Sequence, residues 1–224
     1  MSRIFVWSGG ALFVIALAWC AWWYIGPLGA SSSGGGWRAL LADAGLLTVF
    51  AFHHSLFARA TVKTRMTRLV PAALERSVYV WTASLLLILV CVCWRPIGGT
   101  LSDSRGWLAT LHAGVQLFGV GLIARSVAGI DPLELAGIRA QATRGGLQTA
   151  GPYGWVRHPL YLGWVIALFG AAHMTADRLA FAAITTFYLM LAVPWEERSL
   201  LDSFGDEYRR YQRRVRWRIV PYVF

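Results

Sequence analysis

The chain has 224 residues, of which 57% are hydrophobic and 14% are charged, and its mean hydropathy is +0.51. Soluble domains carry about 25% charged residues, so this composition argues against a soluble globule and favours a protein of the lipid bilayer. The net charge of +10 does not indicate nucleic-acid binding, because the basic residues alternate with apolar stretches instead of gathering on one soluble face.

Six stretches are apolar enough to form membrane helices, since about 20 mostly apolar residues cross the hydrocarbon core. They cover approximately residues 4–25, 38–58, 76–95, 107–129, 159–175 and 178–195. The last two are short and are joined only by residues 174–178, which predicts a tight helical hairpin with Asp177 capping its second arm. A cleaved signal peptide is the alternative for the first stretch, but its bulky end, Trp22 and Trp23, favours a membrane helix.

The expected fold is therefore an all-α polytopic membrane bundle of about six transmembrane helices. We expect a single domain over residues 1–224, with four helices in residues 1–129. Residues 130–224 then hold a polar loop, the hairpin and a basic tail. Cys20, Cys91 and Cys93 all fall inside apolar stretches, which indicates small core residues and neither a disulfide nor a metal site.

The basic residues predict the orientation of the helices, because arginine and lysine are enriched in cytoplasmic loops. They concentrate in the second-to-third connection, the fourth-to-fifth connection and the tail: Arg59, Lys63, Arg65, Arg68, Arg76, Arg139, Arg144, Arg157, Arg209, Arg210, Arg213, Arg214, Arg216 and Arg218. The loops at residues 27–36 and 95–106 carry far fewer charges. Both termini are therefore expected on the cytoplasmic side.

The most informative segment runs from Gly151 to Gly163 with the sequence GPYGWVRHPLYLG. Pro159 lacks an amide hydrogen and suits the first turn of a helix, and it restricts His158 before it to a non-helical conformation. The free amides of such a helix start attract an anion. The acidic pair Glu196 and Glu197 lies at the inner end of the next helix, so the hairpin is expected to return it close to His158.

Adjacent acids on a helix point in different directions, so one member of the pair can bind a ligand while the other pairs with an arginine. Aromatic faces attract cations, and Tyr153, Tyr161 and Tyr208 are the candidates for such a contact. Each residue also has a plainer interpretation. Arg157 can anchor lipid headgroups, the tyrosines can belong to an interfacial belt, and the acids can balance the basic tail.

Taken in order, the Arg-His-Pro loop, the apolar hairpin, the acidic pair and the tail resemble the isoprenylcysteine carboxyl methyltransferase and phospholipid methyltransferase superfamily. Upstream motifs at residues 52–59, 70–79, 94–97 and 135–139 resemble its branch of methanethiol S-methyltransferases and nurim-like proteins. The resemblance implies an integral membrane enzyme that uses S-adenosylmethionine. It implies a cofactor site built from Thr149, Gly151, Tyr153, Arg157, His158, Tyr161, Gly163, Glu196, Glu197, Tyr208 and Tyr211.

Within that set, Gly151 and Gly163 are expected to serve a backbone turn and a close helix approach more than direct ligand contact. After Glu197, apolar residues recur at helical spacing from Leu200 to Tyr211, which predicts a C-terminal amphipathic helix at the membrane interface. The resemblance adds that this helix closes over the cofactor.

On the acceptor side, His53 and His54 point to different faces of the second helix, and Glu196 and His54 are the catalytic candidates. A hydrogen-bonded interfacial role is the alternative for each histidine, and a metal site lacks an obvious third ligand. The isoprenylcysteine branch has a basic residue shortly before the acidic pair, whereas residues 192–195 here are Ala-Val-Pro-Trp.

The absence of that basic residue favours a small apolar thiol such as methanethiol as the methyl acceptor. Methylation of a prenylated cysteine carboxylate or of a phospholipid amine is the alternative, and a non-enzymatic nurim-like membrane protein is another. We expect membrane lipids but no nucleic acid as partners. The expected location is a bacterial inner membrane with the active site facing the cytoplasm.

Overall fold

The computed structural model describes residues 2–30, 33–57, 62, 70–139 and 146–224. These residues form two compact units. The first unit comprises Met1–Gly99, Ile130–Thr143 and Thr175–Asp177, and the second comprises Thr100–Gly129, Arg144–Met174 and Arg178–Phe224. Five of the basic residues that predict the orientation lie outside the described residues: Arg59, Lys63, Arg65, Arg68 and Arg144.

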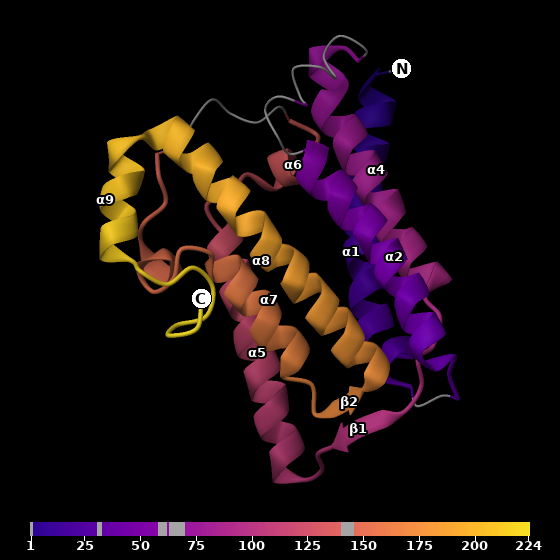
Figure 1. The fold of residues 1–224 in the computed structure, drawn as a ribbon. Helices are drawn as coiled ribbons and strands as arrows, with labels where there is room; N and C mark the ends of the chain where they lie inside the picture. The colour runs from indigo at the N-terminus through magenta and orange to yellow at the C-terminus, as the bar shows by residue number, and fades with distance from the viewer. Residues whose placement is uncertain (1, 31–32, 58–61, 63–69, 140–145) are drawn as a thin grey trace. The chain divides into compact units, whose positions relative to one another are not determined.

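The first unit is built on three long apolar helices that lie side by side, α1 (Ser2–Ile25), α2 (Gly36–Phe57) and α4 (Ala72–Cys93) (Figure 1). The short helices η1 (Pro27–Gly29) and α6 (Pro132–Leu135) complete it. Apolar side chains such as Leu47 and Val90 are buried between the helices, and many others are exposed around them. An apolar outer surface is what lipid tails require of a helical bundle.

The second unit contains α5 (Trp107–Val127), α7 (Pro159–Phe169), most of α8 (Ala176–Phe204) and α9 (Asp206–Arg214). The turn η2 (Gly151–Gly154) precedes α7. A two-stranded sheet pairs β1 (Thr100–Asp103) with β2 (His173–Thr175).

These elements confirm the expected polytopic helical bundle and correct its details. Among the described residues, five helices are long and apolar enough to cross a membrane, and α7 is a shorter apolar helix. The segment 159–175 was expected to be helical throughout, but α7 ends at Phe169 because the chain turns at Gly170 into strand β2. The next helix is longer than expected and continues through Pro194, where proline removes only one backbone hydrogen bond of the helix.

Asp177 does not have the capping role expected of it. Its Oδ1 atom accepts hydrogen bonds from the Trp94 indole nitrogen at 2.8 Å and from the Ile97 amide at 2.9 Å, and its Oδ2 atom accepts from the Gly98 amide at 3.2 Å. All four residues belong to the first unit. The carboxylate therefore ties the start of α8 to the segment that follows α4, and a long-range contact replaces the local cap.

Helices α5 and α7 make the closest helix contact in the second unit, and Gly119 and Gly163 form it. A Cβ atom at Gly163 would lie 2.7 Å from the Gly119 carbonyl oxygen and 2.8 Å from Cγ1 of Ile123. Small residues allow such close approach between membrane helices. The expectation that Gly163 serves helix packing is confirmed, and this contact fixes the helix on which the candidate site begins.

Gly163→Ala is expected to lower stability by about 1–2 kcal/mol, because the added methyl group overpacks a backbone-to-backbone contact. The matched control is Gly114→Ala on α5, where an added Cβ would meet nothing within 4 Å. Thermal unfolding of the purified variants in detergent compares the two midpoints. Equal midpoints for the two alanine variants would contradict the packing role.

Candidate functional site

The loop before α7 has the turn that the sequence predicts. Gly151 has φ of 60°, a left-handed conformation that favours glycine. Pro159 occupies the first position of α7, and His158 before it is non-helical with φ of −124° and ψ of 66°. The predicted helix start is confirmed, and Arg157 and His158 lie in the loop directly before it.

The backbone amides at this helix start are largely satisfied within the protein. The His158 amide donates to the Arg218 carbonyl at 2.8 Å, and the amides of Tyr161 and Leu162 both donate to the His158 carbonyl at 3.1 Å. Pro159 has no amide hydrogen to offer. The expectation of a helix end with several free amides for an anion is therefore wrong, because the C-terminal segment and the capping carbonyl already use them.

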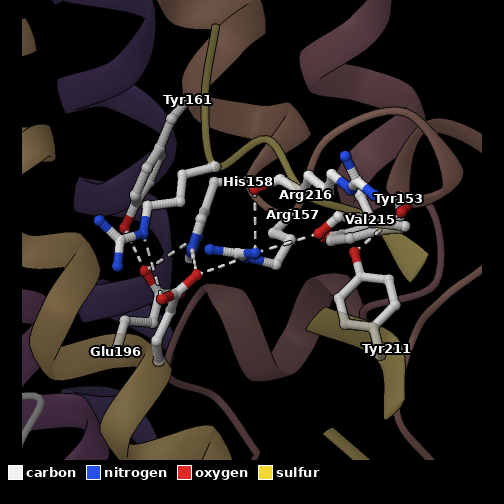
Figure 2. A network of polar contacts seen from close by, with 10 residues as sticks. Tyr153, Arg157, His158, Tyr161, Glu196, Tyr211, Val215 and Arg216 are labelled. Atoms are coloured by element: carbon white, nitrogen blue, oxygen red, sulfur yellow. Dashed lines mark hydrogen bonds and ion pairs between the residues drawn. The ribbon is translucent and has the colours of Figure 1, made fainter. Parts of the chain in front are cut away.

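The C-terminal segment, residues 215–219, lies along the Arg157–His158 dipeptide. The Arg157 amide donates to the Trp217 carbonyl at 2.9 Å, next to the bond from His158 to Arg218. Nη1 of Arg157 donates to the carbonyl oxygens of Val215 at 3.0 Å and of Arg216 at 3.1 Å (Figure 2). The C-terminal segment therefore holds Arg157 through hydrogen bonds to both its backbone amide and its guanidinium group.

Glu197 on α8 is the counter-charge of this arginine. Its Oε1 atom lies 2.6 Å from Nε of Arg157, and its Oε2 atom lies 3.3 Å from Nε of Arg218. The Glu197 and Arg157 side chains are only 6% and 8% exposed, so the pair is buried. Nε2 of His158 lies 3.5 Å from the same Oε1 atom, within ion-pair range but without a hydrogen bond. Glu197 therefore joins the loop, α8 and the tail in one charged network.

Glu196, the other acid, has a different environment. Its side chain is 46% exposed, and its Oε2 atom accepts a hydrogen bond from the Tyr161 hydroxyl at 2.8 Å and lies 3.5 Å from Nδ1 of His158. The rings of His158 and Tyr161 stack with their centroids 5.4 Å apart (Figure 2). As the sequence predicts, one acid pairs with an arginine, and the other offers a partly exposed carboxylate beside two aromatic rings.

Helix α9 contributes two buried tyrosines. Tyr208 and Tyr211 form an apolar cluster with Val215, against which Leu200 and Phe204 of α8 pack. The predicted amphipathic segment is thus divided between two helices. Gly205, with φ of 51°, interrupts the helical backbone between the end of α8 and the start of α9.

Both tyrosines are neutral packing residues at physiological pH. Burial raises the pKa of Tyr211 to about 12 and raises the pKa of Tyr208 as well. The Tyr211 hydroxyl donates to the Tyr153 carbonyl at 2.8 Å, and the Tyr153 hydroxyl donates to the Ser126 carbonyl at 3.3 Å. These bonds attach α9 and the loop to α5.

The structure brings most of the predicted site residues together in the second unit. Hydrogen bonds and short contacts join them in two groups: Arg157, His158, Tyr161, Glu196 and Glu197 in one, and Tyr153 and Tyr211 in the other. Thr149 is half-buried in the loop before Gly151. His54 belongs to the first unit, where its Nδ1 atom lies 2.9 Å from the Tyr79 hydroxyl.

Sequence reasoning missed the role of Arg218 and of the carbonyl groups of the tail. The tail contains many arginines, and no spacing rule distinguishes the one that reaches Glu197. One signal was available, however: a carboxylate that is buried with an arginine often needs further hydrogen bonds, and the tail is the nearest source of basic groups in the sequence.

Comparison with known proteins identifies the family. The model of the isoprenylcysteine carboxyl methyltransferase family matches residues 139–202. A methanethiol S-methyltransferase of Mycobacterium tuberculosis is 39% identical over 80% of this chain and 77% of its own length. Methanethiol S-methyltransferase 1 of Bradyrhizobium diazoefficiens is also 39% identical, over 80% of this chain and 66% of its own length.

The chain belongs to this family, in the branch of the methanethiol S-methyltransferases and nurim. The nurim homologue of Drosophila melanogaster is 31% identical over 64% of this chain and 62% of its own length. No solved structure matches the chain. The family and the apolar helices together identify an integral membrane methyltransferase, and the family match includes Arg157, His158 and both acids.

Proposed function

We propose that this membrane methyltransferase transfers a methyl group from S-adenosylmethionine to a small thiol such as methanethiol. The observation that supports the donor most directly is the environment of Glu196. Its carboxylate is partly exposed beside the stacked rings of Tyr161 and His158, next to the buried Arg157–Glu197 ion pair. A site of this kind suits a ligand that carries positive charge.

The chemistry of the donor fits this set of groups. S-adenosylmethionine carries an ammonium and a sulfonium, for which a carboxylate and aromatic faces are suitable partners. It also carries one carboxylate, for which we propose Arg218, because the Arg218 side chain is 38% exposed and uses Nε for Glu197. When bound, S-adenosylmethionine supplies the methyl group: a nucleophile attacks the methyl carbon in line with its bond to sulfur, and S-adenosylhomocysteine leaves.

The residues of the chain then have distinct tasks. The buried Arg157–Glu197 pair holds the loop against α8. The exposed carboxylate of Glu196, together with Tyr161, binds and orients the positively charged end of the donor. A thiol has a pKa of about 8.5 or higher, so a base that accepts its proton accelerates the reaction. Glu196 and His54 are the candidates that the sequence suggests for catalytic roles.

The acceptor is inferred from the relatives and from one local feature. Relatives that cover most of this chain are named methanethiol S-methyltransferases. The half-exposed segment before Glu196, residues 192–195, carries no basic side chain for a substrate carboxylate. Both points favour a small neutral thiol over a prenylated cysteine.

We also propose that the site faces the cytoplasm of a bacterial cell from the inner membrane. Support comes from the basic residues on the loop and tail around the site, among them Arg157, Arg209, Arg213 and Arg216. A reporter fused to the C-terminus tests the orientation: green fluorescent protein should fluoresce and alkaline phosphatase should stay inactive. The opposite pair of results would reverse the proposed topology.

The test of the proposed function is product analysis. The purified protein in lipid nanodiscs, given S-adenosylmethionine and methanethiol, is expected to form dimethyl sulfide and S-adenosylhomocysteine in equal amounts. Gas chromatography measures the thioether and liquid chromatography measures the nucleoside. Methyl label in the lipid fraction without dimethyl sulfide would instead identify a lipid acceptor, and donor binding without product from either acceptor class would refute the proposed acceptor.

A further inference from the structure

A small pocket lies between α2 and α4 in the first unit, apart from the charged network described above. Its volume is about 190 Å³. Its lining combines apolar and polar side chains from both helices: His53, Phe57, Glu75, Val78, Tyr79 and Thr82. Pockets for drug-sized ligands measure about 300–1,000 Å³, so this one fits a molecule of few heavy atoms and no prenyl or acyl chain.

His53 in this pocket has a buried ring nitrogen without a polar partner in the described part of the chain. Its Nδ1 atom is buried and has no hydrogen-bond partner among the described residues. The ring is fixed by stacking on Phe57, with centroids 4.7 Å apart, and on Tyr79, with centroids 5.6 Å apart. Buried polar atoms normally have a partner, so an unpaired nitrogen at a pocket indicates a place for a ligand group.

His54 contrasts with its neighbour. It is exposed, and its Nδ1 atom lies 2.9 Å from the Tyr79 hydroxyl oxygen, so that nitrogen already has a partner. Adjacent residues on a helix point to different faces, and here His53 lines the pocket whereas His54 does not. Of the two histidines, it is His53 that has a buried ring nitrogen without a partner among the described residues.

The chemistry of the lining restricts the ligand. In the neutral tautomer with its hydrogen on Nε2, Nδ1 of His53 accepts a hydrogen bond, and the ligand then donates one. The Glu75 carboxylate in the lining repels anions. Phe57 and Val78 supply apolar walls. A small, neutral, largely apolar molecule with one weak donor satisfies all of these conditions, and a short alkyl thiol is such a molecule.

We infer that this pocket binds the small thiol acceptor, with Nδ1 of His53 accepting the hydrogen bond of its S–H group. The inference rests on the proposed function, which it deepens by assigning a site to the acceptor. It also replaces His54 by His53 as the residue that contacts the thiol. The Glu75 carboxylate in the lining disfavours a ligand that is itself a carboxylate.

Steady-state kinetics with methanethiol test the inference with two variants of His53, one that removes the acceptor atom and one that keeps an acceptor. His53→Phe keeps a stacking ring without the acceptor atom and is expected to raise KM for methanethiol at least tenfold, with the Kd of S-adenosylmethionine unchanged. His53→Asn places an amide oxygen near the position of Nδ1 and is expected to recover part of the loss. Phe52→Leu, at an exposed neighbouring position on α2, is the control.

Two results would overturn the inference. One is an unchanged KM in His53→Phe together with a raised KM in His54→Phe. The other is an equal loss of donor affinity in His53→Phe, which would indicate a general structural effect.

A binding measurement separates this inference from the proposed function. In protein labelled with ¹⁵N-histidine, the Nδ1 resonance that disappears in His53→Phe is expected to shift saturably when methanethiol is added. A shift without any dimethyl sulfide would keep the binding site and refute the proposed reaction. Dimethyl sulfide without a shift would keep the reaction and refute the site.

Discussion

Glu196→Gln is expected to weaken the binding of S-adenosylmethionine by about 10–100-fold while the protein stays folded. The substitution keeps an oxygen for the Tyr161 hydroxyl but removes the negative charge from a side chain that is 46% exposed. Hydrogen bonds to charged groups contribute about 1.5–3 kcal/mol, and each 1.4 kcal/mol is a factor of about 10 in affinity. Calorimetry in detergent measures the affinity, and thermal unfolding shows that the fold is intact.

Two controls make this result specific to the site. Glu207→Gln removes an exposed acid on α9 that has no place in the network and is expected to leave the affinity unchanged. S-adenosylhomocysteine lacks the sulfonium charge, so Glu196→Gln should weaken its binding less than that of S-adenosylmethionine if the carboxylate is near the sulfonium. An equal loss for both ligands would assign Glu196 to the ammonium group, and no loss for either would remove Glu196 from the donor site.

The parts of this site that the sequence predicts are those set by local rules. Pro159 determines where α7 begins, Gly151 has the backbone conformation that only glycine adopts readily, and the order of helices returns the acidic pair to the loop. These features depend on a few neighbouring residues or on a single hairpin. The pairing of one member of the acidic pair with an arginine also followed from the sequence, because neighbours on a helix point in different directions.

The parts that were missed depend on contacts between distant segments. The tail bonds to Arg157 and His158 through backbone carbonyls, which carry no sequence signature, and so the helix start was wrongly expected to keep free amides. Asp177 was expected to cap a helix, but its carboxylate accepts hydrogen bonds from Trp94 and its neighbours, which are distant in the sequence. Strand β2 was missed because three residues are too few for an alternating pattern.

Arg157→Met is expected to cost about 3–5 kcal/mol of stability, because it leaves the buried Glu197 carboxylate without its nearest counter-charge. Arg218 remains at 3.3 Å but is more exposed, so it compensates only in part. The substitution also removes the bonds to the Val215 and Arg216 carbonyls and thereby loosens the tail. The thermal unfolding midpoint of the purified variant should fall well below that of the unaltered protein.

The double variant Arg157→Met with Glu197→Leu separates charge from packing. Replacing both members of a buried ion pair by apolar residues of similar size is often neutral or stabilising, so the double variant is expected to be more stable than Arg157→Met alone. Arg105→Ala, which breaks an exposed ion pair with Asp103, is the control and should change stability by about 0–1 kcal/mol. If the double variant is instead as unstable as the single one, the tail contacts and not the buried charge hold this part of the protein together. A stable double variant that no longer binds the donor would show that the charge network is retained for the geometry of the site and not for the stability of the fold.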